Sequence, residues 1–169
     1  MSNSPAFVDS AIELPPPASI PYALLTPLHV ALNAEVSSRD QLFERIGWMI
    51  HARRGPTPPE VARHLMTREL RSSTALGHGI ALPHADVPGL RRPVAAFVRP
   101  RTPISFDAPD GKPVTEVLAL LVPRPGTAAH LDLLARLARL LRQREFRDAL
   151  RECADAQQVE RLFEQRVGA

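Results

Sequence analysis

The chain has 169 residues, 44% of them hydrophobic, which is enough to bury the core of one globular domain. Its formal net charge is only +3, its 21 basic residues are scattered among 18 acidic ones, and aromatic residues make up 5%. Because a nucleic-acid-binding protein needs clustered cations, this class is not favoured and we expect no nucleic-acid partner. The single Cys153 excludes an internal disulfide and any metal site made of cysteines alone.

The sequence shows neither a targeting segment nor a membrane span. Residues 1–21 have no basic start, and Pro15-Pro16-Pro17 interrupts their only apolar part, so neither a signal peptide nor an anchor is expected. The longest apolar run, Val117 to Val122, is too short to cross a bilayer. We therefore expect a disordered proline-rich tail over 1–21 and one cytoplasmic domain over 22–169, without direct membrane insertion.

The first half of this domain predicts two helices. Residues 22–32 are apolar but interrupted by a proline, which indicates a turn followed by a short extended segment. Capping-box patterns at Ser38 and Thr57, each followed by apolar residues at helical spacing, predict helices over 38–53 and 57–71.

The middle of the chain predicts strands and the end predicts helices. Residues 72–79 indicate a small-residue connector, and 86–92 a loop. Strands are predicted at 80–82, 94–98, 102–106 and 114–122, the last buried on both faces. Three amphipathic helices follow, the first capped by Thr127 and the others built around Phe146 and Phe163. Strands confined to the middle, with helices before and after, predict an α/β domain whose sheet is covered on both faces.

Two histidines are candidates for function. His84 follows a glycine-rich connector and a short strand that ends at Pro83, so we expect it at the edge of an element and facing solvent. His130 falls in the first turn of a predicted helix, where an anion is favoured and a neutral imidazole can donate or accept a hydrogen bond. Three other histidines are isolated and are interpreted as partly exposed or satisfied: His29, His51 and His64.

These residues fit a site that handles a phosphoryl group. Such a site needs a nucleophilic imidazole, a guanidinium that binds two phosphoryl oxygens, as Arg68 could, and further donors, as Ser73 and Thr74 could supply. Metal binding by His78, His84 and His130 is the alternative, but none of these has a partner ligand at helical spacing.

Other enzyme classes are less consistent with the sequence. No Gly-x-Ser-x-Gly elbow of a serine hydrolase is present, and Cys153 lies on the apolar stripe of a predicted helix. The short Gly77-His78-Gly79 lacks the Lys-Ser/Thr ending of a Walker loop. No bound nucleotide, other cofactor or metal is therefore expected.

Several motifs carry a family resemblance: Arg68-Glu69, Ser73-Thr74, Gly77-x-Gly79-Ile80-Ala81-x-Pro83-His84 and Pro103-Ile104-x-Phe106-Asp107-Ala108. They resemble the IIA domains of the bacterial phosphoenolpyruvate:sugar phosphotransferase system (PTS), of the fructose/mannitol/nitrogen-regulatory class. The similarity covers roughly residues 24–165. Within this class, the chain looks most like the nitrogen-regulatory member, because no membrane domain is attached to it.

The resemblance implies a single domain with a mixed central β-sheet flanked by helices on both faces. It implies that His84 accepts a phosphoryl group on Nε2 from an HPr-like carrier, with His130 as the second active-site histidine and Arg68 as its charge partner. Three residues are expected to support the phosphoryl group: Ser73, Thr74 and His78.

Two further interpretations stay open at this point. The chain could be a sugar-specific IIA component that passes its phosphoryl group to a IIB protein, or a protein-binding module in which His84 is incidental. The sequence also departs from the family pattern, since His78 replaces a frequent Asn, and Ala75 and Ala85 each replace a frequent Gly.

Overall fold

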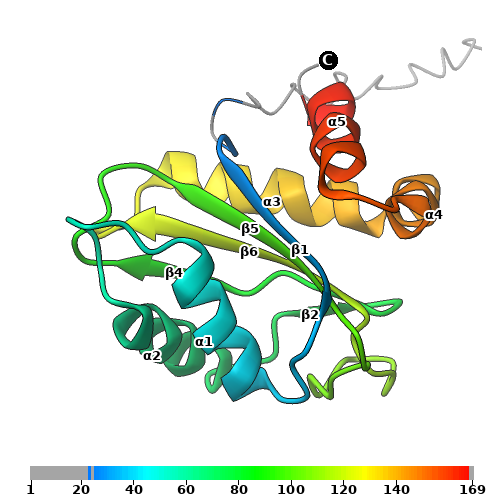
Figure 1. The fold of residues 1–169 in the computed structure, drawn as a ribbon, viewed down its shortest axis with the longest axis horizontal. Coiled ribbons are helices and arrows are strands. Elements are labelled where there is room, and N and C mark those ends of the chain that lie inside the picture. Colours follow the sequence, from blue (N-terminus) through cyan, green and yellow to red (C-terminus); the bar gives the residue numbers. More distant parts are fainter. Residues whose placement is uncertain (1–22, 24, 168–169) are drawn as a thin grey trace, which may run out of the picture.

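The structure is a computed structural model that describes residue 23 and residues 25–167, drawn in Figure 1. The predicted tail over 1–21 lies outside the described residues. The described elements, in chain order, are β1 (Leu28–Ala34), α1 (Arg39–Met49), α2 (Pro58–Glu69), β2 (Ala75–Gly77), β3 (Ile80–Ala81), β4 (His84–Val87), β5 (Val94–Pro100), β6 (Glu116–Pro123), α3 (Ala128–Arg142), α4 (Arg144–Glu152) and α5 (Ala156–Val167). Among them, no helix has the length and apolar character needed to span a membrane.

The strands form one mixed sheet, which confirms the expected fold class. Its order is β1-β5-β6-β3-β2, and β4 also pairs with β6. β5 runs antiparallel to β6, whereas β3 and β4 both run parallel to it. β3 and β4 occupy successive parts of the same edge of β6, since Ile80 lies opposite Glu116 and His84 lies opposite Leu120. The segment that carries His84 is therefore held by the central strand.

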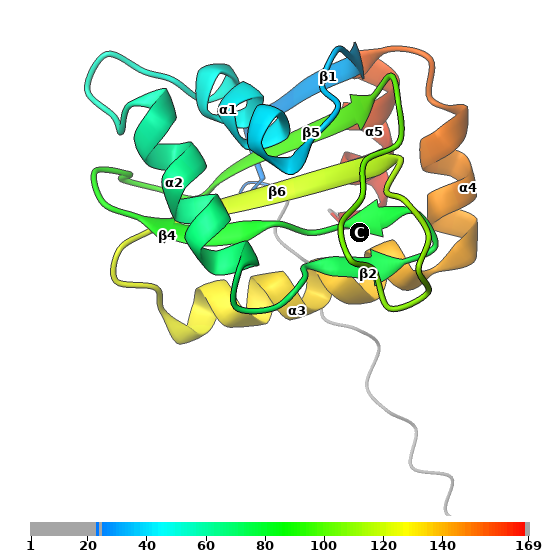
Figure 2. The ribbon, with the colours of Figure 1, turned by 90° about the horizontal axis from the view of Figure 1, so that it is seen from below.

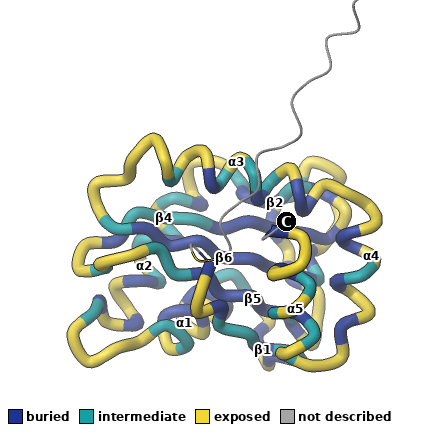
Figure 3. The backbone as a smooth tube through the Cα atoms, turned by 90° about the horizontal axis from the view of Figure 1, so that it is seen from above, coloured by how far each residue is buried: buried dark blue, intermediate teal, exposed yellow. Residues whose placement is uncertain are grey.

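Helices cover both faces of the sheet. α1 and α2 lie on one face and α3 lies on the other, with α4 and α5 at one end (Figures 1 and 2). Side chains of β6 alternate between the two cores: Leu118 and Leu120 belong to the core with α3, α4 and α5, whereas Val117 and Ala119 belong to the core with α1 and α2. Figure 3 shows β6 buried along its length, as predicted from its continuous apolar run.

The two predicted helix starts are confirmed by their caps. The Ser38 hydroxyl accepts a hydrogen bond from the backbone N–H of Gln41 over 3.2 Å, and the backbone N–H of Thr57 donates to Glu60 over 2.7 Å. α1 and α2 then pack very closely, because a Cβ built on Gly47 would lie 2.5 Å from the carbonyl oxygen of Pro58. Both helices end a few residues earlier than predicted.

Three parts of the middle differ from the prediction. The expected connector over 72–79 contains β2, and the expected loop over 86–92 begins inside β4. These short strands exist because they find partners in β3 and β6, and such distant pairing leaves no periodic signal in a few residues. The expected strand over 102–106 forms only one bridge, between Ile104 and Val114.

Candidate functional site

A cleft of 340 Å³ lies where α2, β4 and the first turn of α3 meet. In Figure 2, β4 runs between α2 and the start of α3. Polar and charged side chains line the cleft together with apolar residues from β4, β6 and α3. The lining residues used below are His64, Thr67, Arg68, Arg71, His84, Asp86, Arg124, Thr127 and His130.

His84 is the first residue of β4, and its imidazole is held from both sides. The backbone N–H of Leu120 donates to the carbonyl oxygen of Pro83 over 2.9 Å, which fixes the chain just before His84. The imidazole Nδ1 lies 3.0 Å from the carbonyl oxygen of Leu82. Because a carbonyl oxygen only accepts, Nδ1 carries the proton. The Nε of Arg68 donates to Nε2 over 3.1 Å, so Nε2 is the basic nitrogen and it faces the cleft.

The surroundings of His84 keep it neutral. Burial lowers the pKa of His84 below its ordinary value of 6.5, and the positive charge of Arg68 lowers it further. The Leu82 carbonyl and the carboxylate of Glu69 act in the opposite direction without reversing the shift. At neutral pH the imidazole is therefore uncharged, and its lone pair lies on one defined nitrogen, Nε2, where it accepts the hydrogen bond from Arg68.

Arg68 is placed by the end of α2. Its Nη1 donates to the carbonyl oxygen of Ser72 over 3.0 Å, while its Nε reaches His84. The next residue, Glu69, is buried on the other side of the helix end, where its carboxylate accepts hydrogen bonds from the backbone N–H and the hydroxyl of Thr74, over 3.0 and 2.6 Å. Arg68 thus projects from a helix end that is anchored to the strand region behind it.

His130 is the third residue of α3 and forms a reciprocal cap with Thr127. The backbone N–H of Thr127 donates to His130 Nδ1 over 3.2 Å, and the Thr127 hydroxyl accepts from the backbone N–H of His130 over 3.4 Å. A nitrogen that accepts an N–H cannot carry its own proton, so the neutral His130 is protonated on Nε2. His130 is therefore a hydrogen-bond donor through Nε2, beside the N-terminus of a helix.

The other three expected site residues do not line this cleft. The Ser73 hydroxyl donates to the carbonyl oxygen of Phe106, and the Thr74 hydroxyl donates to Glu69. His78 has a positive φ of 56° in the turn between β2 and β3, and it lines a different cavity beside α4. The structure thus brings together His84, His130 and Arg68 and separates them from Ser73, Thr74 and His78, whose support of a phosphoryl group stays a prediction.

Several residues of the cleft were not singled out from the sequence. His64 and Thr67 of α2, and Arg71 just beyond its end, line the same cleft as Arg68, and the spacing of four residues between His64 and Arg68 was the available signal. Arg124 and Asp86 form an ion pair across the cleft with an N to O distance of 3.3 Å. In residues 25–167, no three His, Cys, Asp or Glu side chains are grouped as metal ligands would be.

A mixed sheet with a neutral histidine, a donor histidine and an arginine around one cleft is suited to binding a phosphoryl group. Residues 23–166 match the family described as "Phosphoenolpyruvate-dependent sugar phosphotransferase system, EIIA 2". The chain belongs to this family, and the resemblance found in the sequence is confirmed.

Individual relatives and a solved structure agree with this assignment. The chain is 35% identical over 136 residues to the nitrogen regulatory protein of Bradyrhizobium diazoefficiens, covering 80% of this chain and 89% of the relative. It is 38% identical over 96 residues to a PTS system fructose-specific EIIA component of Haloferax volcanii, covering 57% and 62%. The crystal structure of the nitrogen regulatory protein IIA-Ntr from Neisseria meningitidis superposes with a TM-score of 0.75 at 38% identity, covering 80% of this chain and 94% of that one. The chain is thus a IIA protein similar to nitrogen-regulatory members.

Proposed function

We propose that this chain is a phosphocarrier of the phosphotransferase system, which accepts a phosphoryl group on Nε2 of His84 from an HPr-like carrier protein and signals to regulatory target proteins through its phosphorylation state. The observation that carries the proposal is the state of the His84 ring. Its Nδ1–H donates to the Leu82 carbonyl and its Nε2 lone pair faces a cleft that holds cationic and neutral donors. The cytoplasmic location expected from the sequence is part of the same proposal.

The transfer itself needs no base. The Nε2 lone pair attacks phosphorus, the bond between phosphorus and the carrier breaks, and the carrier keeps that electron pair. His84 then bears a positive charge shared over the ring, while Nδ1 keeps its proton. The Leu82 carbonyl, 3.0 Å from Nδ1, stabilises this charge as it develops. Positioning and charge stabilisation are the main requirements of phosphoryl transfer.

Two side chains would stabilise the phosphoryl oxygens. Arg68 stands at Nε2 and can redirect its guanidinium N–H groups to the oxygens that arrive there. His130 offers its Nε2–H from across the cleft. The N-terminus of α3, which begins beside Thr127, adds the positive end of a helix dipole.

Regulation and sugar uptake share this chemistry. The similarity to nitrogen regulatory proteins favours regulation, whereas the similarity to a fructose-specific EIIA component supports the alternative, in which a IIB protein receives the phosphoryl group. Transfer from the phosphorylated chain to a purified fructose-type IIB protein tests this alternative. Efficient transfer would favour sugar uptake, and stable retention of the label would favour regulation.

The acceptor is tested by incubating the chain with labelled phosphoenolpyruvate and the general phosphotransferase enzymes of the same organism. We expect an acid-labile, base-stable label that His84→Ala abolishes. His51→Ala is the matched control, because His51 is exposed in the connection after α1, meets Trp48 edge to face and is absent from the cleft. Labelling that survives in His84→Ala, or an acid-stable label, would exclude His84 as the acceptor.

A further inference from the structure

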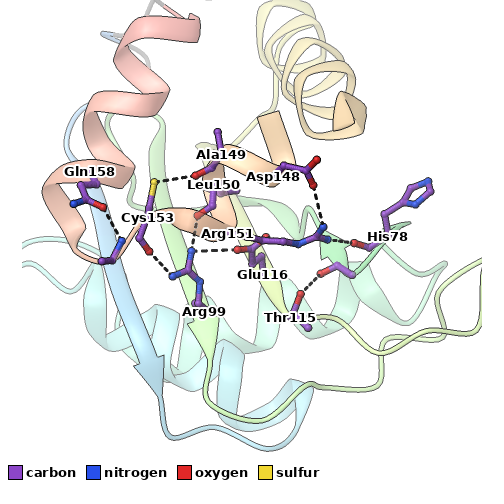
Figure 4. A network of polar contacts seen from close by, with 12 residues as sticks. His78, Arg99, Thr115, Glu116, Asp148, Ala149, Leu150, Arg151, Cys153 and Gln158 are labelled. Carbon is purple, nitrogen blue, oxygen red and sulfur yellow. Dashed lines mark hydrogen bonds and ion pairs between the residues drawn. The ribbon is translucent and has the colours of Figure 1, made fainter. Parts of the chain in front are cut away.

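A second cavity lies at the other end of β6 from His84. It has a volume of 690 Å³ and is bounded by the turn at His78 and Gly79, by the segment from Lys112 to Thr115, and by α4. Figure 4 shows part of its wall, with Arg151 reaching from α4 towards His78 and Asp148. Because His84 pairs with Leu120 whereas this cavity adjoins the residue before β6, the two sites are separate.

The charges around this cavity are strongly unbalanced. Four basic side chains line it, namely Lys112, Arg144, Arg147 and Arg151, against the single carboxylate of Asp148. The lining therefore carries an excess of three positive charges, in a chain whose total net charge is +3. Cations gathered in one concavity repel one another unless an anion lies between them.

The donors of this cavity are incompletely used. The side chain of Lys112 has no hydrogen bond or ion pair within the described part of the chain. The carboxylate of Asp110 interacts with its charge, but the oxygens of Asp110 already accept from two backbone N–H groups. Arg144 approaches Asp148 only to 3.5 Å, and 87% of its side chain is exposed. Arg151 lies 3.7 Å from the same carboxylate. These long contacts leave N–H groups available to a ligand.

The wall behind these donors is rigid. Arg99 of β5 donates to the carbonyl oxygens of Leu150 and Cys153 over 2.6 and 2.7 Å and pairs with the buried Glu116 over 3.2 Å (Figure 4). Arg151 contacts the other Glu116 oxygen at 3.7 Å and donates to the carbonyl oxygen of His78. Arg151 is therefore held in place between α4, β6 and the β2–β3 turn before any ligand arrives.

Arg147 contributes charge and a further unused donor. Its guanidinium donates to the carbonyl oxygens of Leu141 and Arg142 at the end of α3, which accounts for its burial. Its Nε is buried without a hydrogen-bond partner among the described residues. The residue as a whole is 7% exposed, and this exposed part lines the cavity. Arg147 thus adds positive charge to the wall of the cavity while its guanidinium is held at the end of α3.

The turn at Gly79 completes the cavity. Its φ of +79° disfavours a side chain, and a Cβ there would lie 2.9 Å from Thr115 Oγ1 and 3.6 Å from an Arg151 nitrogen. The bare backbone lets the turn approach Arg151 closely.

We propose that this cavity binds a small phosphate-type anion, such as a phosphorylated metabolite or inorganic pyrophosphate. Guanidinium and ammonium groups from two separate segments converge on it, and an excess of three charges favours a multiply charged oxyanion over a single carboxylate. No Phe, Tyr or Trp is among the residues that line the cavity, which disfavours the stacking that single-stranded nucleic acid would need. The proposal is independent of phosphoryl transfer at His84.

The test uses the fact that Lys112 is the only lysine of the chain. Isotope-labelled lysine gives one side-chain resonance inside the cavity, and the amides of Gly79 and His84 report on the two sites separately. We expect titration with pyrophosphate to shift the Lys112 and Gly79 signals saturably. Arg144→Gln should weaken this binding about tenfold, because it removes a charge-assisted donor. Asp148→Asn should tighten it, because it releases Arg144 and Arg151.

The matched control is Arg53→Gln, an exposed arginine in the connection between α1 and α2, which should leave pyrophosphate affinity unchanged. Shifts confined to His84 and its neighbours would overturn the proposal, since they would assign pyrophosphate to the first cleft. Equal weakening by Arg53→Gln and Arg144→Gln would also overturn it, because binding would then follow net charge alone. The amide spectra show in the same experiment whether each variant is folded.

Discussion

The Nε of Arg68 donates a hydrogen bond to Nε2 of His84 over 3.1 Å, so the cation stands at the atom that the proposed reaction would phosphorylate. A guanidinium cannot keep this bond once phosphorus is attached to the nitrogen. It has to transfer its N–H groups to the phosphoryl oxygens, which lie within reach of the same fork. The contact in the free protein thus prepares the stabilisation of the product.

Arg68→Gln is expected to slow phosphoryl acceptance by about 100-fold, because one charged donor to the developing phosphoryl charge is lost. The same substitution should raise the pKa of His84, since the charge of Arg68 lowers it. Arg68→Lys keeps the charge but loses the paired N–H donors of the guanidinium, so its rate should lie between those of the original chain and of Arg68→Gln. Labelling kinetics and an NMR titration of His84 measure both effects. If Arg68→Gln raises the pKa of His84 but leaves the labelling rate unchanged, the only role of Arg68 is its electrostatic effect on His84 in the free protein.

His130→Ala is expected to slow acceptance by about 10- to 100-fold while leaving His84 as the acceptor, because it removes the Nε2–H donor. His130→Gln retains an amide donor on a side chain of similar reach, so it should lose less. Quench-flow labelling measures the rates, and peptide mapping identifies the labelled residue. Equal losses in the two variants would mean that neither an amide donor nor the cap with Thr127, which a Gln can also form, accounts for the contribution of His130.

The sequence predicted the layers of the fold well because its strongest signals are local. The capping patterns at Ser38 and Thr57 and the apolar run of β6 each act within a few residues, and each formed the expected element. β4 was missed because its ladder depends on Leu120 and its neighbours, which lie far along the chain. Strands this short are determined by their partners.

The site was predictable only in part, because some of its features also depend on contacts between segments that are distant in the sequence. His84, Arg68 and His130 were identified by motif resemblance, and the structure places them around one cleft. The tautomers of the two histidines could not be predicted, because they depend on the carbonyl of Leu82 and the N–H of Thr127. The hydroxyls of Ser73 and Thr74 donate to the Phe106 carbonyl and to Glu69, and their expected support of a phosphoryl group stays a prediction.

The pH dependence of stability should reflect three partly buried histidines. Burial lowers the pKa of His84, and also those of His29 and His64, below their ordinary value of 6.5. Between the folded and unfolded pKa values the unfolded chain binds more protons, so the free energy of unfolding falls as the pH drops below about 6.5 and levels off below the folded values. Above that pH the contribution is fully present.

Urea unfolding at a series of pH values between about 7.5 and 5.5 measures this loss, in a range where carboxylates of ordinary pKa stay ionised. Burial raises the pKa of Glu116, so the loss due to His84 is taken from the difference between the original chain and a His84 variant. His84→Gln should show a smaller loss than the original chain, because one of the three groups no longer titrates. The exposed His51→Gln is the control and should follow the original curve. A slope that is unaffected by His84→Gln would contradict the burial argument.

Thr74→Val is expected to lower the free energy of unfolding by about 1–3 kcal/mol, because the buried carboxylate of Glu69 loses its 2.6 Å hydroxyl donor and gains no water in exchange. Thr74→Ser keeps the hydroxyl and should lose less. Since Glu69 follows Arg68 directly, we also expect slower phosphoryl acceptance in Thr74→Val. Chemical denaturation and labelling kinetics check both. A Thr74→Val variant as stable as the original chain would show that the hydroxyl contributes nothing to stability.

Gly47→Ala tests the close contact between α1 and α2. Within a helix this change ordinarily stabilises by about 1 kcal/mol. Here the new Cβ would lie 2.5 Å from the Pro58 carbonyl oxygen and 2.9 Å from its Cα, and backbone atoms cannot move aside as a flexible side chain can. The sign should therefore reverse, with a loss of about 1–3 kcal/mol as for other overpacked sites. Gly55→Ala is the control, because its nearest contact would be 3.7 Å away, and it should change the free energy of unfolding little.

Because α2 carries Arg68, displacing this helix should also slow phosphoryl acceptance in Gly47→Ala but not in Gly55→Ala. A Gly47→Ala variant as stable as the original chain would show that the two helices can separate without cost.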